Sequence, residues 1–139
     1  MTLHVLDTDM LTLFEKADAA VLQHVRAAPP ESLSTTIISV QEQLDGWKDR
    51  LPRAKTRAKL ARLYQRFTDT VQFLARLRIL SLAEPAIARF EQLQKLKLNI
   101  GKMDLRIAAI ALEADAILVT RNVQDFKRVP GLRIQDWSK

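Results

Sequence analysis

The stretch LHVLDTD, at residues 3–9, decides the fold class, because an apolar strand-like run there gives way abruptly to acidic residues and a helical segment. The same change follows the runs TIISV at residues 36–40 and ILVT at residues 117–120. Strand-like runs that alternate with helical segments predict βαβ units with right-handed crossovers. We therefore expect an α/β fold with a short, mainly parallel sheet flanked by helices.

The same patterns place the individual elements along the chain. We expect strands at residues 2–6, 33–38, 78–82, 116–119 and 132–135, and helices at 8–16, 19–27, 40–51, 53–77, 85–96, 102–114 and 123–127. Only three glycines occur, so there is no glycine-rich phosphate loop of the dinucleotide-binding or Walker type.

Four acidic residues follow the predicted strands or lie in the first turns of the helices after them. In an open α/β sheet such positions converge at the carboxyl ends of the strands, where ligands bind. Carboxylates gathered at one place repel one another without a cation, and their oxygens suit Mg²⁺ or Mn²⁺. We expect these four to form a metal site: Asp7, Glu42, Asp104 and Asp125.

Each acid taken alone has an ordinary structural interpretation. Asp7 could only cap the following helix, Glu42 could be a solvated helix residue, and Asp104 could complement a helix dipole. Gly46 lies four residues after Glu42, and a glycine inside a helix suggests a close approach there.

Asp125 also has an ordinary structural interpretation, and two further acids, Asp9 and Asp115, are weaker candidates. Asp125 stands three residues after Asn122, in a pattern that resembles a capping box. Asp9 could add a carboxylate to the rim of the site, whereas Asp115 is expected to end its helix and face solvent.

Length and composition agree with one domain over residues 1–139. The chain has 47% hydrophobic residues, no cysteine and a formal net charge of +6. Disulfides and thiolate metal sites are excluded. No stretch reaches the roughly 18 apolar residues of a membrane span, so we expect a cytoplasmic protein with no membrane partner. The basic balance fits a nucleic-acid partner.

The chain resembles PIN-domain ribonucleases, and more narrowly the VapC class of toxin–antitoxin endonucleases. The resemblance rests on residues 6–9, on the Glu42 to Gly46 spacing, on residues 103–109 (MDLRIAA), and on 118–122 (LVTRN) with Asp125, Phe126, the segment 130–132 and Trp137. Two positions depart from the pattern: Asp9 stands where asparagine is common, and Gln43 follows Glu42 where leucine is common.

The resemblance implies a three-layer PIN-like sandwich and a metal-dependent endoribonuclease that acts as a toxin. It assigns the four acids to a Mg²⁺ or Mn²⁺ site, with Thr120 and Asn122 as polar supports. It also implies an RNA substrate, a cognate antitoxin and a homodimer.

Basic residues suggest where a polyanion would lie. The helical stretch from Lys48 to Arg78 is rich in positive charge, either as a solvated face or as a surface that follows phosphates. We name five candidates for RNA contact: Arg53, Lys55, Arg57, Arg106 and Arg121.

Two other functions stay open on the sequence. A non-catalytic PIN-like module would bind RNA or protein without cleavage. The segment 5–9 also resembles the D-x-D start of haloacid-dehalogenase-like phosphatases, in which Asp7 would be the nucleophile and Asp9 the acid/base. Met10 and Thr12 depart from that second pattern.

Overall fold

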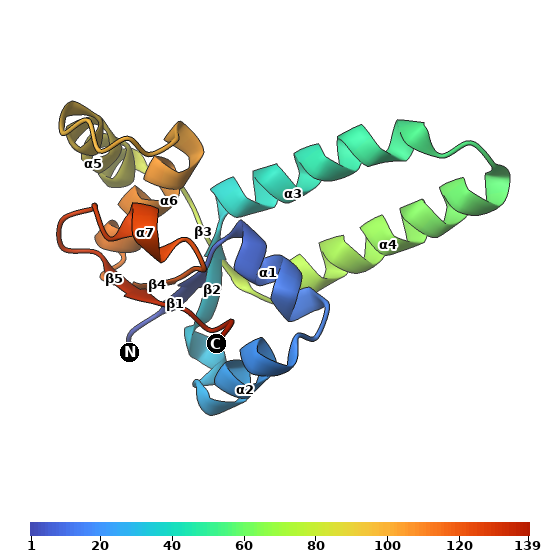
Figure 1. Cartoon of the computed structure of the whole chain (residues 1–139), viewed down its shortest axis with the longest axis horizontal. Coiled ribbons are helices and arrows are strands. Elements are labelled where there is room, and N and C mark those ends of the chain that lie inside the picture. Colours follow the sequence, from blue (N-terminus) through green and yellow to red (C-terminus); the bar gives the residue numbers. More distant parts are fainter.

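A five-stranded parallel sheet forms the centre of the computed structural model, which describes residues 1–139 (Figure 1). The strand order is β3-β2-β1-β4-β5, and every neighbouring pair is parallel. The strands are β1 (His4–Leu6), β2 (Leu33–Thr36), β3 (Arg78–Leu80), β4 (Ile117–Val119) and β5 (Arg133–Gln135). The prediction of a mainly parallel α/β sheet is confirmed.

Helices cover both faces of this sheet and complete three layers. They are α1 (Thr8–Glu15), α2 (Ala19–Ala27), α3 (Ile37–Arg50), α4 (Arg57–Ala75), α5 (Glu84–Lys95), α6 (Lys102–Glu113) and α7 (Val123–Phe126), with short 3-10 turns η1 (Pro30–Ser32) and η2 (Leu51–Arg53). No helix is long and apolar enough to cross a membrane. In Figure 1, α3 and α4 run out from the sheet together as a long hairpin.

Two hydrophobic cores lie on opposite faces of the sheet, because successive side chains of a strand point to opposite sides. Val5 of β1 belongs to the core beneath α5 and α6. Its neighbour Leu6 belongs to the other core, with Met10 and Leu11 of α1 and Val21 of α2. The central strand is thereby buried on both faces, as a parallel sheet requires.

The polar sequence of β2 is buried at the same time. The Ser34 hydroxyl donates to the His4 carbonyl at 2.9 Å, and the Thr35 hydroxyl donates to the Leu6 carbonyl at 2.8 Å. Because these hydroxyls bond to the main chain of β1, burying them leaves no unpaired group.

Two predicted boundaries were wrong for local reasons. Strand β2 ends at Thr36 rather than residue 38, because the Thr36 hydroxyl accepts from the Ser39 amide at 3.1 Å and caps α3. Helix α4 begins at Arg57 rather than residue 53, because the chain first makes η2 and Thr56 then caps the helix.

The close approach expected at Gly46 is also wrong. A β-carbon added there would meet only the Arg50 guanidinium, at 3.5 Å, which is ordinary contact with the end of a flexible side chain.

Candidate active site at the carboxyl edge of the sheet

Asp7 is the most firmly held of the predicted acids. It follows β1 directly, its amide donates to the Val119 carbonyl at 3.1 Å, and its side chain caps α1. Oδ1 accepts from the Met10 amide at 3.0 Å, and Oδ2 accepts from the Thr120 hydroxyl at 2.5 Å. The residue is 8% exposed. The capping interpretation is therefore correct, and it coexists with a place in the acidic site.

Thr120 is the support that the resemblance implied. It follows β4 and is fully buried. Its hydroxyl donates to Asp7 and accepts from the Asn122 amide at 2.9 Å. The two bonds fix the direction of the hydroxyl, so the turn after β4 orients the carboxylate that follows β1.

Glu42 reaches the same place from the second turn of α3. Its Oε1 accepts from the Thr8 hydroxyl at 2.6 Å, and that hydroxyl also lies 3.1 Å from the Ser39 hydroxyl. Glu42 is thus tied to the first residue of α1 and is not a freely solvated side chain.

A cavity of about 200 Å³ collects most of the predicted acids. Asp104 lies half-buried in the first turn of α6 and meets Asp7, which caps α1, and Glu42 of α3. The cavity is lined by Asp7, Thr8, Asp9, Glu42, Asp104, Asn122 and Phe126. Three of the four acids expected at a metal site therefore line one cavity, and Asp9 lines it with them.

Asp125 lies beside this cavity rather than in its lining. Its Oδ2 accepts from the Asn122 side-chain amide at 3.0 Å, and its Oδ1 lies 3.4 Å from Arg128. The Asn122 side chain makes no capping bond to α7, so the capping-box interpretation is wrong. Asn122 instead joins Asp125 to the cavity wall.

Two of these acids have raised pKa values, chiefly because they are buried and further because other carboxylates lie near them. Burial raises the pKa of Asp7 to about 6, against hydrogen bonds from Thr120 and Met10 that lower it. Burial also raises the pKa of Asp104, and the charges of Glu42, Asp125 and Asp9 raise it further. Neighbouring carboxylates therefore contribute to the raised pKa values of both Asp7 and Asp104.

The donor set suits a hard divalent cation, although the side chains do not yet form a cage. No three acidic side chains are close enough together to ligate one ion as they stand. Mg²⁺ is commonly bound through one or two carboxylates while it keeps several waters, so a complete cage is not required. The only basic group within ion-pair distance of the cavity acids is Arg121, 3.9 Å from Asp9 at the rim.

The five candidate RNA-contact residues are divided among different places. Arg106 points away from the acids, because its guanidinium lies 5.1 Å from the Phe90 ring centre and 3.4 Å from the Met103 sulfur. Arg121 lies at the rim of the acidic cavity. Arg53 lines a different cavity, on the hairpin, whereas Lys55 and Arg57 are exposed outside it.

Sequence reasoning missed Thr8 and Ser39 as organisers of the site. The available signal was the position of Thr8 between two acids at a helix start, together with Ser39, a single hydroxyl in the otherwise apolar first turn of α3. Only the packing of α1 against α3 shows that the two hydroxyls meet.

The fold and this cavity define a parallel α/β protein with an acidic site at the carboxyl ends of its strands. The family model described as PIN domain matches residues 5–132. The chain belongs to the PIN-domain family.

Several relatives carry ribonuclease names. The chain is 37% identical over 71 residues to Ribonuclease VapC2 of Rickettsia felis, covering 48% of this chain and 53% of that protein. It is 50% identical over 40 residues to Ribonuclease VapC1 of Haemophilus influenzae, covering 29% and 30% of the two chains. The match thus spans about half, or less, of the length of these curated relatives.

Solved structures extend the likeness over the whole fold. A chain of VapBC2 from Rickettsia felis bound to a DNA fragment from their promoter has a TM-score of 0.79 at 23% identity, covering 98% of this chain and 99% of that one. DNA-bound VapBC from Salmonella typhimurium has a TM-score of 0.78 at 22% identity, covering 99% of both chains. The predicted PIN-like sandwich is confirmed.

Proposed function

We propose that this chain is a metal-dependent endoribonuclease that hydrolyses phosphodiester bonds of RNA, and that it is the toxin of a toxin–antitoxin pair. The observation that carries the proposal is the acidic cavity, where Asp7, Glu42 and Asp104 meet at the carboxyl edge and the pKa of Asp7 is raised to about 6. Perturbed acids in a cleft are typical of functional sites. The ribonuclease names of the relatives support the choice of reaction.

The acids Asp7, Glu42, Asp104 and Asp125 would hold Mg²⁺ or Mn²⁺. The bound ion would supply Lewis-acid activation of water and neutralise charge that develops at phosphorus.

The neighbouring hydroxyls and amide keep the acids in place. Thr120 keeps the Asp7 carboxylate pointing to the cavity edge, and Thr8 holds Glu42 across from it. Asn122 fixes Asp125 on the side of α7. Because the nucleophile is water rather than the ribose 2′-hydroxyl, we expect products with a 5′-phosphate and a 3′-hydroxyl.

The partners of this function are also proposals. We propose an RNA substrate, self-association as a homodimer, and a cognate antitoxin. The antitoxin is supported by structural neighbours described as VapBC assemblies and as members of toxin–antitoxin systems. An arginine or lysine of that antitoxin would suit the acidic cavity, because bidentate guanidinium–carboxylate bonds are strong.

The phosphatase alternative fits the geometry poorly. Asp7 is buried, and its two oxygens are held by hydrogen bonds to the start of α1 and to the turn after β4. Asp9 is largely exposed and faces Arg121 rather than the Asp7 carboxylate.

The test is cleavage of total RNA with Mg²⁺, with Mn²⁺ and with chelator, followed by sequencing of the new ends. Asp104→Asn and Glu42→Gln should lose metal-dependent cleavage while staying folded. Asp115→Asn is the matched control, because Asp115 is an exposed acid paired with Arg133 and precedes β4, whereas the cavity lies at the carboxyl end of that strand. Undiminished cleavage in the folded cavity variants would refute the assignment. RNA binding without cleavage by the native protein would favour the non-catalytic module.

The toxin role has its own test. The protein encoded beside this chain should co-purify with it and suppress the nuclease. If expression of this chain alone leaves cell growth and RNA intact, the toxin role is wrong even though the fold stands.

A further inference from the structure

The α3–α4 hairpin carries another cavity, lined mainly by basic residues, which we call the hairpin cavity. Its volume is about 370 Å³. It is lined by Arg50, Arg53, Ala54, Lys59, Arg62, Leu63 and Arg66. Five of the seven lining residues are positively charged and none is acidic.

The spacing of these residues explains why the charges converge. Lys59, Arg62 and Arg66 of α4 are separated by three and four residues, so they share one face of the helix. Arg50 and Arg53 are three apart, at the end of α3 and in η2, and line the cavity from the opposite arm. The turn at η2 folds the two arms back, so that both basic faces border one space.

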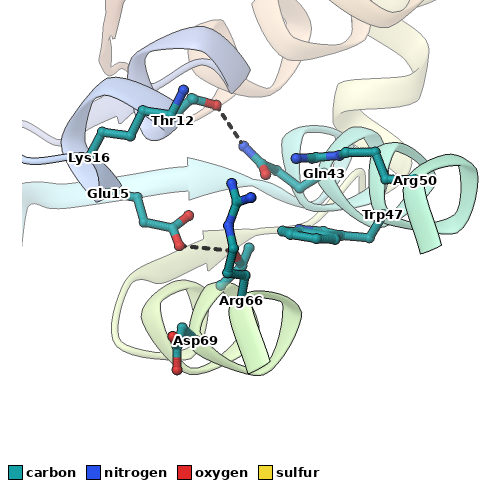
Figure 2. A pocket seen from close by; sticks show the side chains of 9 residues that line it. Thr12, Glu15, Lys16, Gln43, Trp47, Arg50, Arg66 and Asp69 are labelled. Carbon is teal, nitrogen blue, oxygen red and sulfur yellow. Dashed lines mark hydrogen bonds between the residues drawn. The ribbon is translucent and has the colours of Figure 1, made fainter. Parts of the chain in front are cut away.

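Trp47 supports two of the arginines that line the hairpin cavity. Its ring is 3% exposed and stacks on Phe67 of α4 with ring centres 5.6 Å apart. The guanidinium of Arg50 lies 4.1 Å from the Trp47 ring centre, and that of Arg66 lies 5.6 Å away. Figure 2 shows both arginines approaching this ring from their separate helices. Guanidiniums held on an aromatic ring lose less freedom when they bind a ligand.

No carboxylate lines the hairpin cavity, although Glu15 and Asp69 line the adjoining cavity that shares Arg50 and Arg66 with it. None of its five basic side chains lies within ion-pair distance of an acid, although four such pairs form elsewhere in the protein. Like charges this close destabilise one another, and an anionic ligand relieves the repulsion. Arginine forks match phosphate oxygens in pairs.

The position of the cavity favours a nucleic-acid strand over a compact anion. Along α3, Glu42 lines the acidic cavity, and its neighbour Gln43 lines an intermediate cavity of about 220 Å³. Arg50 and Arg66 line both the intermediate cavity and the hairpin cavity. The rise of 1.5 Å per helical residue puts Arg50 roughly 12 Å beyond Glu42. Phosphates bound here are therefore not the one that is cleaved.

We propose that the hairpin cavity binds the phosphodiester backbone of RNA on one side of the scissile bond and so positions the strand along α3. This inference rests on the proposed RNA substrate and adds a second contact region, remote from the acids. It replaces Lys55 and Arg57, expected from the sequence, with Arg50, Lys59, Arg62 and Arg66 beside Arg53.

The experiment compares two triple variants that each remove three positive charges from the same hairpin. The hairpin triple is Arg53→Gln, Lys59→Gln and Arg62→Gln. The control triple is Lys48→Gln, Lys55→Gln and Arg57→Gln, at exposed positions outside the cavity. The probe is a fluorescein-labelled single-stranded RNA of about 20 nucleotides, long enough to span several contacts.

Binding is measured by anisotropy in EDTA, so that no divalent cation supports cleavage, from about 50 to 200 mM KCl. Each phosphate contact on single-stranded RNA contributes about 0.7 to the slope of log affinity against log salt concentration. We expect the hairpin triple to flatten this slope by about 2. The control triple should keep the native slope. Thermal melts verify that both variants fold, and the double variant Lys59→Gln, Arg62→Gln replaces the hairpin triple if that triple does not.

Two results would overturn the inference: equal slopes for the two triples, or displacement of the RNA by polyglutamate at the same concentration of charge. The second result would identify the cavity as a site for an acidic protein segment. Because binding needs no cleavage, a native protein that binds as expected but never cuts RNA would refute the proposed nuclease and leave this inference standing. If the native protein cuts RNA but the hairpin triple binds RNA with the native salt slope, the proposed nuclease stands and the hairpin inference is refuted.

Discussion

Asp7→Asn should stabilise the metal-free protein at neutral pH, although it removes a residue of the proposed active site. Asp7 is buried, and its pKa is raised to about 6 because burial outweighs the hydrogen bonds from Thr120 and Met10. The folded protein therefore prefers the neutral acid. Asparagine has nearly the same shape and carries no charge at any pH.

The size of the effect follows from the difference between the folded pKa of about 6 and the ordinary aspartate pKa of 3.8. At about 1.4 kcal/mol per unit, the buried charge costs about 3 kcal/mol of folding free energy. Because the folded pKa is raised, the contribution of Asp7 to native stability is most favourable below about pH 4 and is lost as the pH rises through about 6. Above that pH the full cost is present in the native protein and absent in the variant.

One hydrogen bond limits the gain. Asparagine has a single acceptor oxygen, so it can accept from Met10 or from Thr120 but not from both. A lost bond of this kind costs about 1 kcal/mol. We therefore expect a net gain of about 2 kcal/mol at pH 7.5, which is on the order of 5–10 °C in Tm.

The assay is urea unfolding of both proteins between about pH 4 and pH 8 in EDTA. The stability difference should grow in favour of the variant as the pH rises between about 4 and 6, then level off. Asp115→Asn serves as the control, because that side chain is 98% exposed and should show no such rise. A variant that is less stable than the native protein at pH 7.5, with a difference that ignores pH, would refute the reasoning.

Three further outcomes are expected. Adding Mg²⁺ or Mn²⁺ should raise the Tm of the native protein and not that of Asp7→Asn, since a ligand stabilises only the state that binds it. Thr120→Val removes a donor to Asp7 and should lower metal-free stability at pH 7.5 by about 1–3 kcal/mol in urea unfolding, with an apparent Asp7 pKa above that of the native protein. Trp137→Phe should be more destabilising than Trp47→Phe in the same assay, because the Trp137 indole donates to Gln135 at 2.9 Å whereas the buried Trp47 indole nitrogen has no partner to lose.

The sequence predicted the fold well where hydrophobic pattern and local chemistry agree. The helix at residues 19–27 has the predicted bounds, since an aspartate caps its start and prolines follow its end. The end of β2 was misplaced because Thr36, Ile37 and Ile38 all favour strands, and only the hydroxyl bond from Thr36 to the Ser39 amide shows where the helix begins.

The acidic site could be predicted because topology brings the carboxyl ends of parallel strands together. Its finer organisation could not. Whether Asp125 faces the cavity depends on its bond to the Asn122 side chain, and whether Arg106 faces it depends on packing against Phe90. Both are contacts between side chains whose directions no residue spacing specifies.

The hairpin cavity could not be predicted from the sequence, for a related reason. The sequence predicts one long helix whose lysines and arginines form a single charged face. Nothing in that pattern distinguishes Lys55 and Arg57 from Arg53 as candidates for RNA contact. The 3-10 turn η2 and the Thr56 cap break that helix, which turns residues 55 and 57 out and folds Arg53 toward α4.

The acidic cavity and the hairpin cavity lie near the two ends of α3. Because a helix fixes the separation of its residues, α3 would hold a phosphate-binding region at a constant distance from the acids. A strand bound at both places would hold the phosphate at the acidic cavity a constant distance from the hairpin contacts, whatever its sequence, because phosphate contacts position a strand without reading its bases.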